Sequence, residues 1–179
     1  MGRYRKIDSR IWNDEKFCSF SDNGKLAFLF LLTHPNMTSL GAMRASIPGL
    51  AAELGWTEKA FREAFREPLA KGLVSIDERA SCIALRNFLK YNPPENPNVV
   101  KSWTGSLDLI PECKIKAQVV EIARMKAESL PKAFLEALPE LFSKPFRIPE
   151  QEPEQEPEQE PEPNLPKKEE IEKKKEPVA

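Results

Sequence analysis

Three basic residues recur at helical spacing in the middle of the chain. Lys59, Arg62 and Arg66 fall within about 60° of one another on a helix of 3.6 residues per turn. The opposite side of that helix carries its apolar residues, Phe61, Ala64, Phe65 and Leu69. This division predicts an apolar back packed in a core and a cationic front. Such a front can reach phosphates or guanine edges, which is the chemistry of a DNA-recognition helix.

Other residues of the same stretch favour a plainer interpretation. Any surface helix shows a charged outer face, and Glu63 and Glu67 lie beside the basic trio, where they would repel phosphate. Pro68 should kink or shorten the helix, because proline lacks the backbone donor and clashes with the preceding turn. The amino-terminal half of a recognition helix makes most base contacts, so a late kink is compatible with DNA binding.

Capping residues delimit two successive helices around a tight turn. Ser46 can cap a first helix that Gly55 ends, and Thr57 can cap a second helix over about 58–71 that Gly72 ends. Helix, turn and helix in this order predict a helix-turn-helix.

A hairpin is predicted directly after the second helix. Residues 74–76 and 82–85 are β-prone runs joined by a polar turn, which completes the order of a winged helix-turn-helix. Arg79 at the tip and Arg86 at the exit are candidate phosphate contacts, as is Arg44 before the first helix, although a solvated arginine is the ordinary alternative. The predicted DNA-binding residues are Arg44, Thr57, Lys59, Arg62, Arg66, Arg79 and Arg86.

The remaining foldable chain predicts further helices. Ser21 can cap a helix over about 22–32 that is apolar nearly all round and belongs at the centre of a core. Residues 41–44 predict a third strand for the wing sheet, and residues 3–8 predict a short edge strand. After the rigid break at 93–97, the predicted helices span about 97–109, 111–128 and 130–142.

Charge and proline divide the chain into a body and a tail. Residues 1–149 carry 22 Lys and Arg against 17 Asp and Glu, a net charge of +5, whereas residues 150–179 carry 5 against 11, a net charge of −6. The repeated Glu-Gln-Glu-Pro of the tail predicts an extended, disordered segment. It could shield the basic body or serve as a solubilising spacer. We therefore predict a winged-helix DNA-binding domain at 1–93, a helical extension at 94–148 and a disordered tail at 149–179.

The sequence lacks the residue patterns that metal sites, disulfide frameworks and phosphate-binding loops require. The three cysteines Cys18, Cys82 and Cys113 form no Cys-x-x-Cys pair, and His34 is the only histidine, so neither a disulfide framework nor a metal site is expected. No glycine loop for phosphate is present, and we expect no enzyme and no cofactor. The basic start of the chain precedes no apolar run, so we expect a cytoplasmic protein without membrane contact.

Two further stretches carry a resemblance to a known group of proteins. They are Trp12–Phe17 with Lys25–Thr33, and the segment Asn87–Trp103, which contains Asn-Pro-Pro-Glu-Asn-Pro. Together they resemble the amino-terminal winged-helix part of phage and prophage replication initiators, the replisome organisers and DnaD-like primosomal proteins, over about residues 3–111. The resemblance implies binding to an origin or other double-stranded DNA, self-association, and recruitment of a helicase loader or helicase.

The sequence thus predicts a mostly α protein with a small β-wing: a winged helix-turn-helix, a short helical extension and a disordered acidic tail. The predicted function is duplex-DNA binding in phage-type replication initiation, with helix 57–71 in the major groove and the wing on the backbone. A transcriptional regulator with the same fold, or a winged-helix protein-docking module that does not bind DNA, are the alternatives.

Overall fold

The computed structural model describes residues 5–142 of the chain. The predictions for the tail at 149–179 and for the first residues of the 3–8 strand lie outside the described residues. The elements are η1 (Ser9–Asn13), α1 (Glu15–Cys18), α2 (Asp22–Thr33), β1 (Ala42–Arg44), α3 (Ile47–Glu53), α4 (Glu58–Ala70), β2 (Val74–Asp77), β3 (Cys82–Leu85), α5 (Phe88–Tyr91), α6 (Pro97–Lys101), α7 (Trp103–Asp108), α8 (Lys114–Glu128), α9 (Lys132–Glu136) and η2 (Glu140–Phe142).

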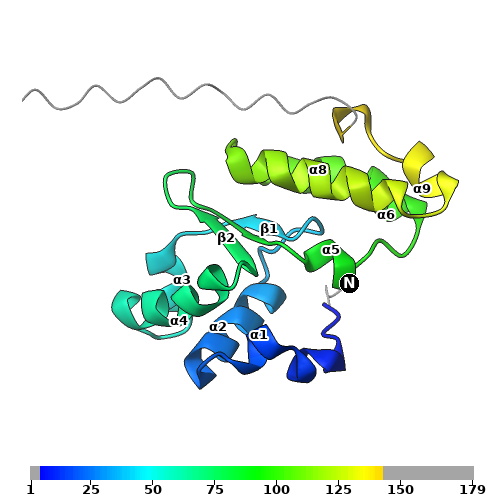
Figure 1. Cartoon of the computed structure of the whole chain (residues 1–179). Coiled ribbons are helices and arrows are strands. Elements are labelled where there is room, and N and C mark those ends of the chain that lie inside the picture. The colour runs from blue at the N-terminus through cyan, green and yellow to red at the C-terminus, as the bar shows by residue number, and fades with distance from the viewer. Residues whose placement is uncertain (1–4, 143–179) are drawn as a thin grey trace, which may run out of the picture. The chain divides into compact units, whose positions relative to one another are not determined.

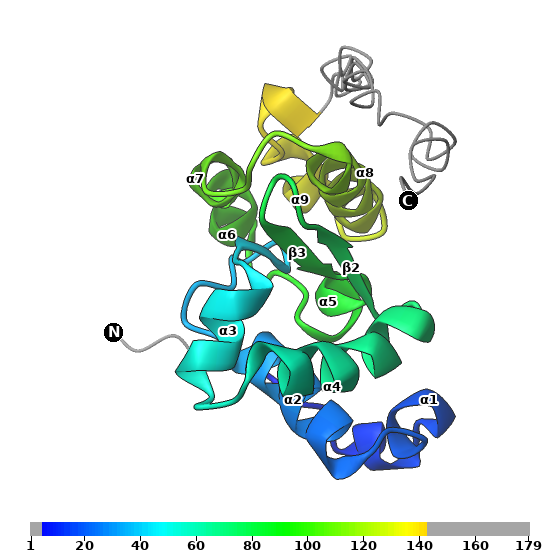
Figure 2. The ribbon, with the colours of Figure 1, turned by 90° about the vertical axis from the view of Figure 1, so that its left-hand side faces the viewer.

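The described residues are mostly helical, with one small antiparallel sheet in the order β1-β3-β2. The register pairs Ala42 with Ala84 and Val74 with Leu85, so the central strand β3 binds both neighbours along its length. Helices α2, α3 and α4 lie on one side of the sheet and α8 lies on the other (Figures 1 and 2). The sheet therefore separates the segment with the basic trio from the later helices.

Side-chain caps set the starts of the three helices below the sheet. The hydroxyl oxygens of Ser21, Ser46 and Thr57 accept hydrogen bonds from backbone N–H groups three residues on, at 3.1, 3.3 and 3.2 Å. Gly55 and Gly72 follow the ends of α3 and α4 with a φ of +69° each, the left-handed conformation that glycine adopts without strain. The caps and glycines in the sequence were therefore sufficient to predict these helix ends.

One cluster of buried side chains joins the two sides of the sheet. Phe61 and Ile83 belong to it, and so do Trp103 and Ala123 from the later helices; all four are 0% exposed. The cluster crosses the proline-rich break at 93–97, so the segments before and after it share a core. The division into a domain at 1–93 and an extension at 94–148 remains a prediction. In the structure, the described residues on both sides of this boundary pack in one core.

The later helices differ from the sequence prediction in their extents. The helix predicted at 97–109 is two helices, α6 and α7, separated at Ser102, whose hydroxyl donates to the Val99 carbonyl at 2.7 Å. Serine competes in this way for backbone groups that would otherwise continue the helix. The predicted 111–128 helix begins only at Lys114, and the predicted 130–142 helix is the short α9 followed by η2.

The buried face of α8 follows Ile115, Val119 and Ala123, whereas Ile122 and Met125 are 37% and 58% exposed. Residues 5–8 form no strand; the Asn92 side chain accepts from the Lys6 backbone N–H at 2.9 Å and holds this segment beside α5.

Candidate nucleic-acid interface

Helix α4 has one face in the core and one face in solvent. Phe61, Ala64, Phe65 and Pro68 are buried, and the Phe61 and Phe65 rings stack with their centroids 5.9 Å apart. Leu69, expected on this face, is 38% exposed. The helix runs through Pro68 to Ala70, so the proline does not shorten it appreciably. This packing leaves the opposite face of α4 exposed.

The outward face of α4 carries the predicted basic trio. Lys59, Arg62 and Arg66 are all exposed. The side chains of Lys59 and Arg66 make no hydrogen bond or ion pair with any other residue in the range 5–142. Thr57 begins the helix as its cap, and its hydroxyl oxygen is occupied by the Ala60 N–H. Two cations therefore face solvent, Lys59 in the first turn of the helix and Arg66 about two turns further along.

Arg62 differs from its two neighbours because carboxylates hold it from two sides. Its Nε donates to Glu58, one turn earlier, at 2.8 Å, and its Nη1 and Nη2 donate to the two oxygens of Glu78 at 2.9 and 3.2 Å. The hydrogen bonds that Arg62 donates to Glu78 and then to Glu58 raise the pKa of Arg62, and the bonds to Glu78 in turn lower the pKa of Glu78. The charge of Arg62 is thus locally balanced.

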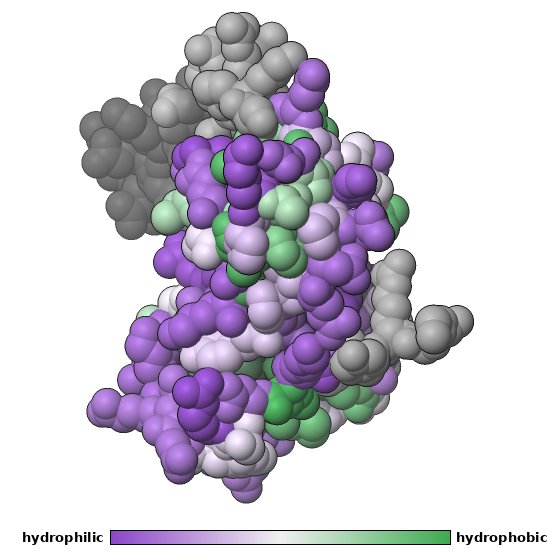
Figure 3. Space-filling view, turned by 90° about the vertical axis from the view of Figure 1, so that its right-hand side faces the viewer, coloured by the Kyte–Doolittle hydropathy of each residue, from purple (hydrophilic) through white to green (hydrophobic). Residues whose placement is uncertain are grey.

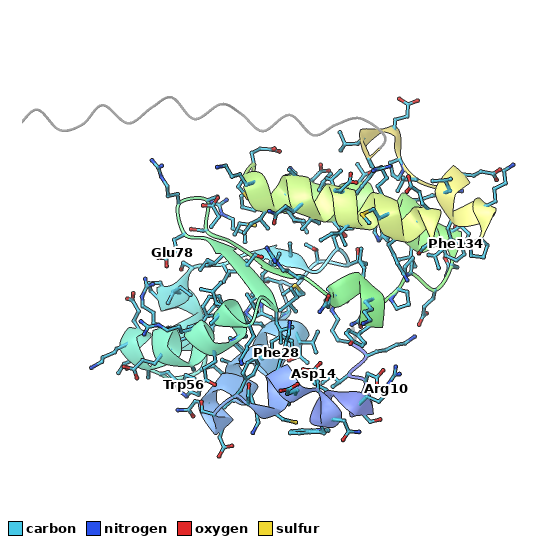
Figure 4. The ribbon with its side chains drawn as sticks, viewed as in Figure 1. Arg10, Asp14, Phe28, Trp56, Glu78 and Phe134 are labelled. Atoms are coloured by element: carbon cyan, nitrogen blue, oxygen red, sulfur yellow. The ribbon has the colours of Figure 1, made fainter. Side chains whose placement is uncertain are left out.

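Glu78 reaches Arg62 from the tip of the β2–β3 hairpin. Figure 4 labels Glu78 at this tip, on the same side of the molecule as the amino-terminal part of α4. The Asp77 carboxylate accepts from the Ala80 N–H at 3.0 Å and the Ser81 N–H bonds back to the Glu78 carbonyl at 3.3 Å. Arg79, next to Glu78, is exposed at the tip. The hairpin therefore brings one carboxylate, that of Glu78, to the basic trio.

Arg44 and Arg86 do not join this surface. Arg44 pairs with Cys82 and, by strand alternation, shares its sheet face with Ala84, which lines a cleft under α8. Arg86 donates from Nε to the Ser75 hydroxyl at 3.0 Å, beside the same cleft. Arg44 therefore shares the sheet face that α8 covers, and Arg86 lies beside the same cleft and close to Gly72, just past the C-terminal end of α4.

Glu67 does not stand beside the basic trio as the sequence suggested. Its carboxylate turns to the start of α2, where it accepts from the Ser21 backbone N–H at 2.7 Å and from the Ser21 hydroxyl at 2.6 Å. A Cβ on Gly24 would lie 2.5 Å from its Oε2, so the glycine permits this approach. Glu63 is exposed, and its side chain makes no hydrogen bond or ion pair within residues 5–142. One of the two expected repulsive carboxylates is thus absent from the outward face.

An apolar hollow near the amino terminus was not predicted. It encloses about 410 Å³ and lies between the first described residues, α2 and α5. Figure 3, which views this end of the molecule, shows hydrophobic surface low on a largely hydrophilic face. Three of its charged lining residues form ion pairs: Asp8 with Arg10 at 2.6 Å, and Lys6 with Glu95 at 2.8 Å. No motif in the sequence marks it, because Ile7, Phe28 and Leu32 converge only in the fold.

Trp56, in the turn before α4, packs against Phe61 with ring centroids 6.3 Å apart. The three cysteines are free, and burial raises the pKa of the Cys82 thiol. Residues 5–142 hold no cluster of three metal-ligating side chains, and none of their helices has the length and apolarity to cross a bilayer.

Comparisons with protein-family models, with curated proteins and with solved structures found no match to this chain.

Proposed function

We propose that this chain binds duplex DNA through the outward face of α4, in the manner of a winged helix-turn-helix. The order α2, β1, α3, α4, β2, β3 and the strand order β1-β3-β2 agree with that arrangement. The observation that carries the proposal is a pair of exposed cations, Lys59 and Arg66, on a helix whose other face is anchored in the core. A rigid back and a cationic front are what groove entry requires.

Affinity would come mainly from phosphate neutralisation. Lys59 and Arg66 would displace counterions from the DNA backbone, so binding should weaken steeply as salt rises. An arginine can also donate two parallel hydrogen bonds to a guanine edge or a phosphate. Thr57 would mainly fix the start of the helix, because its hydroxyl oxygen already accepts from Ala60. Arg79 would add a backbone contact from the hairpin tip.

A role in phage-type replication initiation rests on the resemblance of Trp12–Phe17, Lys25–Thr33 and Asn87–Trp103. A transcriptional regulator would use the same surface, and the two differ in the DNA target: a repeated site in a replication gene against a promoter operator. The remaining alternative is a protein-docking module. It is favoured by the exposed Glu63, which would repel phosphate, and by Arg62, whose charge is balanced by Glu58 and Glu78.

Fluorescence anisotropy with a labelled duplex of random sequence, at low salt and then at rising salt, tests the proposal. The full chain should bind at micromolar protein. The double variant Lys59→Ala/Arg66→Ala should bind many-fold more weakly, with a salt slope reduced by about 2. Lys101→Ala/Lys114→Ala is the matched control, because it removes the same charge from exposed positions on the later helices. Absence of binding by the parent, or equal losses in both double variants, would reject this interface.

A further inference from the structure

The bonds of Arg62 decide what this side chain can do in the free protein. A guanidinium has five N–H donors and offers two edges with paired donors, Nη1/Nη2 and Nε/Nη. Glu78 occupies the first edge with both oxygens, and Glu58 accepts from Nε on the second. Arg62 is therefore left without an intact two-donor edge, and it cannot grip a phosphate or a guanine until one carboxylate leaves.

The hairpin brings Glu78 to this position through its own local structure. The Asp77–Ala80 and Ser81–Glu78 bonds close the turn, and Ser81 adopts a φ of +51° that few residues other than glycine take. The register continues to Asp77 opposite Cys82, so the turn follows directly from the ladder. The hairpin tip thus presents Glu78 from a second element to α4, whereas Glu58 is bound to the same helix as Arg62.

The contact between Arg62 and Glu78 is exposed enough for another anion to replace Glu78. The side chains of Arg62 and Glu78 are 43% and 58% exposed, and ion pairs in such positions are weak in water. A DNA phosphate offers the same geometry of acceptors as a carboxylate and belongs to a polyanion whose counterions are released on binding. A nucleic acid can therefore compete for the edge that Glu78 holds.

We propose that Glu78 is a latch that closes the Nη edge of Arg62 in the free protein and that DNA phosphate displaces it. This inference rests on the proposed function and adds to it a regulatory residue for the same surface. The latch lowers the affinity of the free protein for any polyanion. It also couples the hairpin tip to α4, because the tip loses its contact with the helix when Arg62 turns to DNA.

The test compares Glu78→Gln with Glu63→Gln, its matched control. Each removes one exposed negative charge near the trio, but of these two glutamates only Glu78 bonds Arg62. Glu78→Gln should tighten duplex binding about two- to fivefold beyond Glu63→Gln, the range expected for an exposed ion pair. In an Arg62→Ala background this difference should vanish. Equal effects of the two variants, or a Glu78→Gln gain that persists without Arg62, would overturn the latch.

A second measurement separates the latch from DNA binding itself. Hydrogen exchange of the Arg62 Nε–H and Nη–H groups, followed by NMR in the free protein, should be faster in Glu78→Gln and unchanged in Glu63→Gln. Unchanged exchange in both variants would show that the ion pair is absent in solution and would overturn the latch alone. If exchange responds but no chain binds duplex, the ion pair exists, whereas the proposed function and the regulatory role both fail.

Discussion

Two glutamates on different sides of α4, Glu67 and Glu63, have different roles. On the flank toward α2, Glu67 accepts two hydrogen bonds from Ser21 and joins α4 to the start of α2. On the outward side Glu63, one turn earlier, is exposed and unattached within the described range 5–142. The comparison shows that the charges of the residues in a helix do not by themselves give the electrostatic potential at its surface. Neighbouring elements draw some charged side chains away from the surface and form ion pairs with others.

The largest expected effect concerns the inward face. Phe61→Ala should destabilise the protein by about 3–5 kcal/mol, because it opens a cavity among fully buried side chains. Leu69→Ala on the same helix should cost far less, since Leu69 is 38% exposed. Urea unfolding of the full chain, followed by circular dichroism, measures both. Similar losses in the two variants would contradict the division of α4 into two faces.

The two glutamates of α4 provide the next comparison. Glu67→Ala should lower the free energy of unfolding by about 1–3 kcal/mol, because it leaves the start of α2 without two hydrogen bonds. Glu63→Ala should change it by about 0.5 kcal/mol or less, as surface substitutions usually do. The same unfolding experiment applies, and an unchanged midpoint for Glu67→Ala would remove the assigned link to α2.

A single outward substitution should act on binding and spare stability. Arg66→Ala should leave the unfolding midpoint within error, because the side chain contacts nothing else in the described part of the chain by hydrogen bond or ion pair. It should weaken duplex binding and lower the salt slope by about 1. Anisotropy titrations at several salt concentrations measure the slope. A loss of stability without a loss of affinity would assign Arg66 to the fold.

The smallest expected effect is a pH dependence of the hairpin contact. Hydrogen bonding from Arg62 holds the pKa of Glu78 below its ordinary value of 4.5. A lowered folded-state pKa means that the contact contributes stability above about pH 4.5 and loses it as the pH falls through the lower value. Carbon-13 NMR titration of the Glu78 carboxyl should show a pKa that moves toward 4.5 in Arg62→Ala. An identical titration in both proteins would argue against the ion pair.

Local signals in the sequence predicted the elements well where a cap and a stop were both present. Ser46, Thr57 and Gly72 indicated the limits of α3 and α4 because these residues act on the backbone next to them. The break at Ser102 and the late start of α8 were not predicted, because apolar spacing alone does not locate helix ends. The small three-stranded antiparallel sheet agrees with the predicted β content.

The candidate site was predictable in part. The spacing of Lys59, Arg62 and Arg66 placed all three on the outward face of one helix, as the structure has them. The partners of Arg62 and Glu67 were not predictable, because Glu78 and Ser21 come from elements that meet α4 only in the fold. The side of the sheet on which Arg44 and Arg86 lie was not predictable for the same reason, because strand alternation and register decide it.

A residue-resolved titration tests the central claim most directly. Backbone amide NMR signals of the full chain are followed while a short duplex is added at low salt. Binding through the outward face of α4 predicts that the largest shifts fall on residues 57–66 and on the hairpin tip at 77–81, with small shifts over α8. Shifts concentrated on α8 or around the amino-terminal hollow, with α4 unmoved, would contradict it.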